Sequence, residues 1–301
     1  MLTGPVDATR LEPELARHLP EAEGIFSLLT IPIDEAVLER AQHLRVVSNM
    51  AVGVDNIDVD GCTRRGIPVG NTPGVLTDST ADLAFALLLA AARRLPEAIL
   101  DAKEGRWRTW SPAGWLGADL HGAKLGIIGM GKIGQAVTRR AIPFGMEIFY
   151  TDSTPCGQVE RDLGAVCLPL TDLLERCDFV SIHTPLTPAT RGMINSVALR
   201  RMKPNALLIN TARGPIVDMD ALAQALKEGW IQSAALDVTE PEPLPPEHPL
   251  FHLPNCTITP HIGSATQNTR QRMAELACQN LLAGLQGRRL PHCINPQVYQ
   301  S

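Results

Sequence analysis

The sequence predicts an α/β protein with two Rossmann-like lobes, each built on a doubly wound parallel sheet. Three observations lead to this prediction. Short apolar runs alternate with helical or polar segments along the chain, which is the pattern of βαβ units. A glycine-rich motif at 129–134 follows one such run and opens a helical segment. Because residues 1–128 precede this motif, we expect its domain to be inserted into a discontinuous, flavodoxin-like substrate lobe.

The N-terminal lobe is expected to alternate strands with helices. Apolar runs predict strands at 25–29, 45–48 and 68–70, with helices at 34–41 and 59–65 and one long helix over 80–100. A polar, proline-containing lead precedes the first of these runs. We therefore expect this lobe to lack an opening strand and helix.

The central part of the chain carries continuous apolar runs, which are typical of parallel strands buried on both faces. These runs lie at 124–128, 147–151, 179–183, 206–210, 234–236 and 257–259, with a weaker one at 165–168. A second long helix is predicted over 265–286. The expected domains are a substrate-binding lobe of residues 1–95 plus 270–301, and an NAD-binding domain of residues 96–269.

Composition argues against several classes of protein. The 301 residues carry a formal net charge of -5 and no Lys/Arg-rich run, which disfavours a nucleic-acid partner. The apolar stretch 84–92 is too short to span a membrane, and the N-terminus has no signal-peptide pattern. The seven cysteines form no C-x-x-C pair, so we expect reduced thiols, a cytoplasmic location and no metal.

The glycine-rich motif has the spacing of a dinucleotide-binding fingerprint. Gly129 would allow a tight turn, Gly131 a close approach to a pyrophosphate, and Gly134 close packing of helix on strand. The helix N-terminus would present N–H groups and a positive dipole to the phosphates. Other turns and nucleotide sites also match such a motif, so its strand and helix context matters.

Asp152 ends the next predicted strand, where an acidic side chain can bind the adenosine ribose hydroxyls. A carboxylate there would repel a 2′-phosphate, and no arginine follows closely. NAD(H) is therefore favoured over NADP(H). The alternative is an aspartate that only caps a helix or a turn.

Polar residues follow the other predicted strands, and ligands of open parallel sheets bind outside the carboxyl ends of strands. Arg213, Asp237, Glu242 and His261 lie there, as do Thr184, Pro185, Thr211 and Ala212, at the edge where a nicotinamide would lie. An arginine can hold a carboxylate and polarise the adjacent carbonyl, and an imidazole can donate a proton to its oxygen. A glutamate bonded to the imidazole would orient it and favour its charged form. Taken singly, Arg213 and Glu242 would more often form surface ion pairs, and His261 would more often be a packed loop histidine. Their joint placement at strand ends favours hydride transfer to a 2-oxo acid.

Several motifs in order resemble the D-isomer-specific 2-hydroxyacid dehydrogenases over almost the whole chain, and the glyoxylate/hydroxypyruvate reductase branch most. Besides the fingerprint, the motifs lie at 48–57, 71–83, 210–214, 236–243 and 260–266. The resemblance implies Arg213, Glu242 and His261 as catalytic residues. It also implies that Val52, Gly53 and Ser264 contact substrate with Arg213. The cofactor contacts that it implies are Thr80, Lys132, Ile133, Asp152, Pro185, Thr211, Asp237 and Gly263.

The residues at 50–54 are apolar and include no cation, so a small unphosphorylated acid is expected rather than a phosphorylated one. Two alternatives stay open: another dehydrogenase of the family, of the D-lactate or phosphoglycerate type, and a non-catalytic NAD-sensing protein.

Trp107, Trp110 and Trp115 cluster in one predicted loop. They either pack beneath that loop or contact a second copy, and the resemblance favours a homodimer.

Overall fold

The computed structural model describes residues 2–5 and 8–300, which divide into two compact units. The smaller unit comprises Met1–Leu76 and Ala265–Ser301, and the larger comprises Thr77–Ser264. The first boundary differs from the expected one near residue 95. Helix α4 (Thr77–Ala92) belongs to the larger unit because it packs against that unit's helix α6 and strands β8 and β9.

The larger unit contains a parallel sheet whose described strands number seven, in the order β10-β9-β8-β7-β4-β5-β6. Its strands are β4 (Lys124–Ile128), β5 (Glu147–Thr151), β6 (Val166–Cys167), β7 (Phe179–Ile182), β8 (Leu207–Asn210), β9 (Ser233–Leu236) and β10 (Cys256–Ile258). The order reverses between β4 and β7, as in a doubly wound Rossmann sheet. All six pairings are parallel, which confirms the predicted fold class for this part of the chain.

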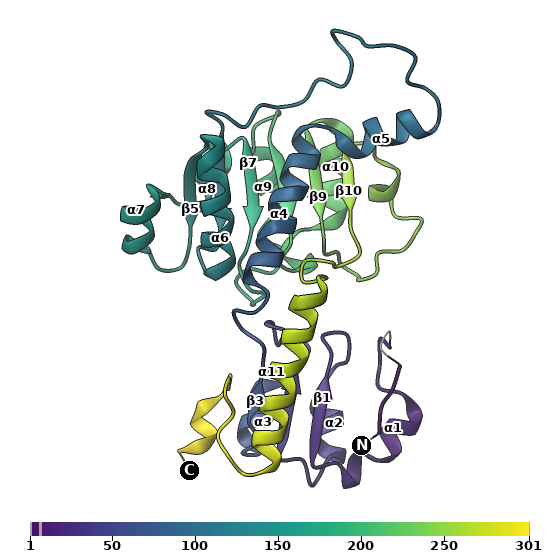
Figure 1. The fold of residues 1–301 in the computed structure, drawn as a ribbon, viewed down its shortest axis with the longest axis vertical. Coiled ribbons are helices and arrows are strands. Elements are labelled where there is room, and N and C mark those ends of the chain that lie inside the picture. The colour runs from purple at the N-terminus through teal and green to yellow at the C-terminus, as the bar shows by residue number, and fades with distance from the viewer. Residues whose placement is uncertain (1, 6–7, 301) are drawn as a thin grey trace. The chain divides into compact units, whose positions relative to one another are not determined.

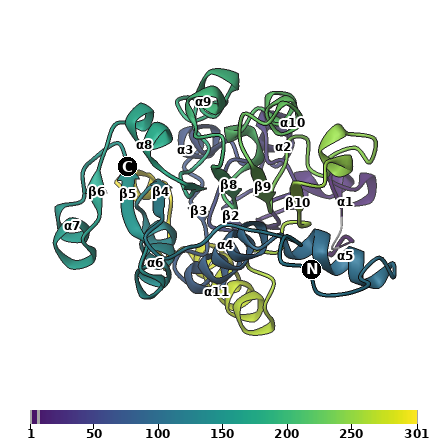
Figure 2. The same ribbon diagram turned by 90° about the horizontal axis from the view of Figure 1, so that it is seen from above.

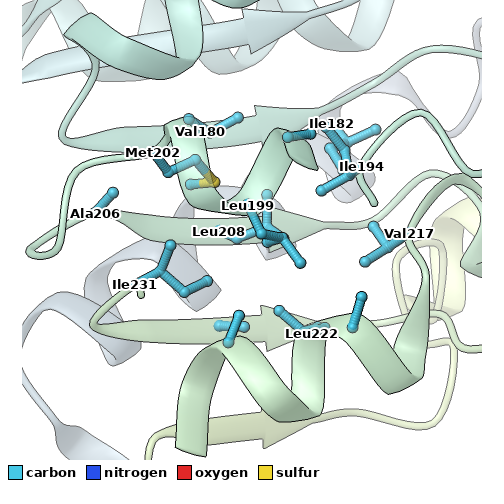
Figure 3. Close-up of a cluster of buried hydrophobic side chains, with 14 of the residues drawn as sticks. Val180, Ile182, Ile194, Leu199, Met202, Ala206, Leu208, Val217, Leu222 and Ile231 are labelled. Carbon is cyan, nitrogen blue, oxygen red and sulfur yellow. The ribbon is translucent and has the colours of Figure 1, made fainter. Parts of the chain in front are cut away.

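Helices cover both faces of this sheet (Figures 1 and 2). On one face lie α4, α6 (Lys132–Ala141) and α7 (Gly157–Leu163); on the other lie α8 (Leu170–Arg176), α9 (Ser196–Arg201) and α10 (Met219–Glu228). Figure 3 shows part of the second face, where Val180 and Leu208 on the strands meet Leu199 and Leu222 on the helices. The continuous apolar runs thus supply side chains to two cores, because alternate residues of each strand face opposite sides.

The long helix predicted over 80–100 is interrupted, so this expectation was wrong. Helix α4 ends at Ala92, Arg94 has a left-handed φ of 52°, and α5 (Leu95–Lys103) then begins. The reason is Pro96: it has no N–H to donate to the carbonyl four residues earlier. That carbonyl, Ala92 O, instead accepts a 2.8 Å hydrogen bond from Ala118 N.

The smaller unit has a described sheet of three parallel strands, β1 (Gly24–Ser27), β2 (Val46–Asn49) and β3 (Val69–Gly70), in that order. Its helices are α1 (Pro13–Arg17), α2 (Glu35–Arg40), α3 (Val59–Arg64) and α11 (Gln267–Leu285). Helix α11 packs on β1 and β2, and a Cβ on Gly284 would lie 2.5 Å from Val46 side-chain atoms. This close contact brings the C-terminal segment back onto the first strands of the chain.

Short 3₁₀ turns complete both units. They are η1 (Leu19–Glu21), η2 (Ile142–Phe144), η3 (Gly214–Ile216), η4 (Pro249–His252) and η5 (Pro296–Tyr299). Across the described ranges, the structure has no helix with both the length and the apolar character needed to cross a membrane.

Candidate active site

The glycine-rich motif forms the turn between β4 and α6. Gly129 has a φ of 95°, and a Cβ there would lie 2.7 Å from Thr184 N. A Cβ on Gly134 would lie 2.2 Å from Gly129 O. By contrast, a Cβ on Gly131 would have no neighbour within 4 Å. Two of the glycines are therefore required by packing, and Gly131 leaves an open approach to the N-terminus of α6, whose first two residues are Lys132 and Ile133.

Asp152 follows β5 and lies beside this turn. Its Oδ2 accepts a 2.7 Å hydrogen bond from Met130 N, and Ser153 Oγ donates to its Oδ1 at 3.2 Å. Its side chain thereby links the end of β5 to the glycine turn. This is the position from which a carboxylate can reach a ribose of a dinucleotide bound at that turn.

The loop after β8 carries Thr211, Ala212 and Arg213, and Asn210 shapes it. Asn210 Oδ1 accepts from Ala212 N at 3.0 Å, and Asn210 Nδ2 donates to Arg213 O at 2.9 Å. Arg213 is half-buried, and its Nη1 donates to Ala212 O at 2.8 Å. Thr211 Oγ1 is buried and has no hydrogen-bond partner within the described parts of the chain. An unsatisfied buried hydroxyl at this edge fits a contact with a bound polar molecule.

Asp237, at the end of β9, is only 1% exposed and organises the loop that follows β10. Its Oδ1 accepts from Thr259 Oγ1 at 2.6 Å and from Ile262 N at 2.8 Å, and its Oδ2 accepts from Gly263 N at 2.7 Å. His261, within this loop, has a left-handed φ of 52°. The hydrogen bonds of Asp237 hold the backbone on both sides of His261 in this unusual conformation.

His261 and Glu242 are in direct contact. His261 Nδ1 lies 2.5 Å from Glu242 Oε1, and the two side chains are 24% and 37% exposed. Glu242 Oε2 accepts a weak 3.4 Å bond from Thr239 N. Because Nδ1 is engaged by the carboxylate, Nε2 is the ring nitrogen left to exchange a proton with another molecule.

The remaining predicted cofactor and substrate residues fall in three places. Gly263 lies against Thr80 of α4, since a Cβ on it would be 3.4 Å from Thr80 Cγ2. Ser264 follows and is buried, and Pro185 follows β7 next to Thr184. Val52 and Gly53 belong to the smaller unit, in the loop after β2.

Two polar residues at the sheet edge were not predicted as site residues. One is Asn210, described above. The other is His183, which directly follows β7: its Nε2 is 2.8 Å from Ser181 Oγ, and burial lowers its pKa to about 3. Its position at a strand end, next to the predicted Thr184 and Pro185, is the signal that could have identified it. Among the described residues, no group of three or more His, Cys, Asp or Glu side chains could hold a metal ion.

Comparison with known proteins gives three concordant results. The family model for the D-isomer-specific 2-hydroxyacid dehydrogenase NAD-binding domain matches residues 85–263. A glyoxylate reductase of Korarchaeum cryptofilum is 52% identical over 285 residues, which cover 94% of this chain and 86% of that protein. The crystal structure of a glyoxylate reductase from Paecilomyes thermophila has a TM-score of 0.86 at 31% identity, covering 94% of this chain and 88% of that one.

A second similar structure is D-lactate dehydrogenase from Aquifex aeolicus in complex with NAD and lactic acid. Its TM-score is 0.87 at 30% identity, with 93% of this chain and 89% of that chain covered. The family model spans more than half of the chain, and the predicted family resemblance and two-lobed Rossmann-type fold are confirmed. The chain belongs to the D-isomer-specific 2-hydroxyacid dehydrogenases and is thus an NAD(P)-dependent oxidoreductase.

Proposed function

We propose that this protein reduces glyoxylate to glycolate, or the similarly small hydroxypyruvate to D-glycerate, at the expense of NADH. The observation that carries the proposal is the 2.5 Å contact between His261 and Glu242 at the sheet edge that also bears Arg213. The names of similar proteins, including the glyoxylate reductase of Korarchaeum cryptofilum, support this choice of substrate.

The residues at the glycine turn fit a dinucleotide. Gly131 leaves room for a pyrophosphate at the N-terminus of α6, and the unsatisfied Thr211 Oγ1 offers a hydrogen bond at the neighbouring strand end. When bound, the reduced nicotinamide supplies a hydride to the carbonyl carbon of the substrate. We assign the remaining predicted contacts to the same cofactor: Thr80, Gly129, Lys132, Ile133, Gly134, Thr184, Pro185, Ala212, Asp237 and Gly263.

Asp152 supports a preference for NAD(H). Its carboxylate already accepts a hydrogen bond from Met130 N, which fixes it near the position of an adenosine ribose. Each carboxylate oxygen can accept a second hydrogen bond, here from a ribose hydroxyl, whereas a 2′-phosphate would meet like charge. The next three residues, Ser153, Thr154 and Pro155, include no cation that would offset this repulsion.

Arg213 is the residue that we assign to the 2-oxo acid. Its planar guanidinium can hold the substrate carboxylate and polarise the adjacent carbonyl. The bonds that Asn210 makes to the 212–213 backbone fix the position from which this side chain extends. We assign further contacts with the carboxylate to the N–H groups of Val52 and Gly53, and a contact with the substrate to Ser264.

His261 is the proton donor in the proposed reduction. As the carbonyl oxygen gains negative charge, Nε2 donates its proton, and Glu242 stabilises the imidazolium through Nδ1 and holds the ring in place. In the reverse direction the neutral ring accepts the proton from the hydroxyl group. The two residues thus act as one acid–base pair.

Other members of the family act on other acids, and the similar structure from Aquifex aeolicus is a D-lactate dehydrogenase. A glyoxylate-sized substrate is favoured here over a phosphorylated acid because residues 50–54 include no lysine or arginine. A non-catalytic NAD sensor would not need the paired His261 and Glu242.

We further propose that the enzyme is cytoplasmic and forms a homodimer. The side chains of Trp107 and Trp110 are 72% and 81% exposed, and we propose that the second copy covers them.

The experiment that tests this function is a substrate panel. The purified protein is assayed with glyoxylate, hydroxypyruvate, pyruvate and 3-phosphohydroxypyruvate, each with NADH and with NADPH. We expect the highest kcat/KM for glyoxylate or hydroxypyruvate with NADH. Faster turnover of pyruvate or of the phosphorylated acid would reassign the substrate, and binding of NADH without turnover of any acid would identify a sensor.

A further inference from the structure

The loop after β2 in the smaller unit is tied down through its carbonyl groups. Ala51 O accepts from Thr72 N at 2.9 Å, Val52 O accepts from Asn71 Nδ2 at 2.8 Å, and Gly53 O accepts from Asn49 Nδ2 at 2.9 Å. Asn49 and Thr72 are 0% exposed and Asn71 is 6% exposed. Three consecutive carbonyls are therefore held by donors that belong to the buried framework.

This arrangement determines where the next N–H groups point. In a trans peptide, the C=O of one residue and the N–H of the following residue point in opposite directions. Because Asn71 donates to Val52 O, the N–H of Gly53 points away from Asn71. In the same way, the N–H of Val52 points away from Thr72, and the N–H of Val54 points away from Asn49. Within the described chain these three N–H groups have no hydrogen-bond acceptor. Val52 is 36% exposed, so this part of the loop reaches solvent.

Successive N–H groups that point away from the framework form a concave site for an anion. We propose that Asn71 and Asn49 are positioning residues for the substrate: they orient the N–H groups of Gly53 and Val54 to bind its carboxylate. The inference rests on the proposed function for the identity of the anion. It adds Val54 as a third donor and explains how an apolar loop with no cation binds a carboxylate.

Both asparagines are themselves held in place. Asn280, in α11 and 0% exposed, donates through Nδ2 to Asn71 O at 2.9 Å and accepts from His292 N at 3.0 Å. Asn49 Oδ1 accepts from Ser27 Oγ at 2.9 Å, and its Nδ2 is also 3.0 Å from Asn56 Oδ1. The side-chain amide of Asn49 thus has one orientation that satisfies all of its neighbours, which fixes its NH₂ group toward the loop, whereas Asn280 holds the backbone from which the side chain of Asn71 extends.

The test compares Asn71→Ala with Asn295→Ala. Asn295 is a matched control because it is also 0% exposed, lies in the same unit and donates through Nδ2 to a backbone carbonyl, Ile67 O, at 3.0 Å. For each variant the assay gives kcat and KM for glyoxylate, the Kd for NADH and the thermal unfolding midpoint. Asn71→Ser, whose hydroxyl is too short to reach Val52 O, is a milder version of the same change.

We expect Asn71→Ala and Asn71→Ser to raise the KM for glyoxylate about tenfold, the loss for one hydrogen bond to a charged group. Because the carboxylate is bound alike in the ground and transition states, kcat should change less than twofold. Asn295→Ala should lower the unfolding midpoint with KM unchanged. An unchanged KM in both Asn71 variants, or an equal rise in Asn295→Ala, would overturn the inference. If the wild-type protein does not reduce glyoxylate, the proposed function fails instead.

Discussion

Glu242 Oε1 lies 2.5 Å from His261 Nδ1, and this contact joins the loops that follow the adjacent parallel strands β9 and β10. The two residues are 19 positions apart in the chain, so the contact depends on the sheet register and on the loop held by Asp237. The pair gives the imidazole one fixed hydrogen-bond partner and leaves Nε2 for proton transfer.

Glu242→Gln should lower kcat for glyoxylate reduction about a hundredfold, since the amide cannot stabilise the imidazolium by charge. The Kd for NADH should stay within twofold of the wild-type value. Steady-state kinetics and fluorescence titration give both quantities. Glu240→Gln is the matched control, because Glu240 is exposed and lies in the same loop. Equal activity in the Glu242 and Glu240 variants would show that the contact has no role in proton transfer.

Asp152→Ser should weaken discrimination between the two cofactors. Losing the carboxylate removes a ribose hydrogen bond and the repulsion of a 2′-phosphate, so we expect the KM for NADH to rise about tenfold and the KM for NADPH to fall. The measured quantity is the ratio of kcat/KM for NADH to that for NADPH. A ratio that is the same in the variant and the wild type would contradict the role given to Asp152.

Two alanine substitutions in the glycine turn should separate packing from cofactor binding. Gly134→Ala places a Cβ 2.2 Å from Gly129 O and should lower the free energy of unfolding by about 1–3 kcal/mol. Gly131→Ala meets nothing within 4 Å, so its stability should match the wild type while its Kd for NADH rises. Urea denaturation and NADH titration provide the data. Unweakened NADH binding by Gly131→Ala would argue against a pyrophosphate at this turn.

The stability of the protein should depend on pH through His183. Burial lowers the pKa of His183 in the folded state to about 3, from 6.5 for an ordinary histidine. Between these values the unfolded chain binds a proton that the folded chain does not. The contribution of His183 to the free energy of unfolding is therefore complete above about pH 6.5 and falls as the pH drops toward 3.

His183→Gln keeps a polar nitrogen near Ser181 Oγ but does not titrate. Between pH 7 and pH 5, its urea midpoint should fall less than that of the wild type. An equal fall of the urea midpoint in the two proteins would show that His183 is protonated in the folded state at pH 5.

Much of the fold could be predicted because the strands of the larger unit are buried on both faces. Runs such as 124–128 and 206–210 are then continuously apolar and stand out from their surroundings. The same reasoning located Arg213 and His261, since the carboxyl ends of parallel strands meet at one edge of the sheet.

What could not be predicted depends on partners distant in sequence. The break between α4 and α5 requires Ala118 to replace the N–H that Pro96 lacks, and the two residues are separated by a loop. Asn71 donates a hydrogen bond to the carbonyl of Val52, 19 positions away, and Asn280 donates one to the carbonyl of Asn71, 209 positions away. Buried asparagines leave no periodic pattern in the sequence, so only the folded structure brings these side chains together.

The central claim is that Arg213 and His261 carry out the reduction of glyoxylate by NADH. The direct measurement is the rate of NADH oxidation over a range of glyoxylate concentrations by the wild type, Arg213→Ala, His261→Ala and the control His252→Ala, whose histidine lies in η4 and is exposed. We predict a fall in kcat/KM of at least a hundredfold for each of the first two variants and wild-type activity for the control. Wild-type rates in both Arg213→Ala and His261→Ala would contradict the account.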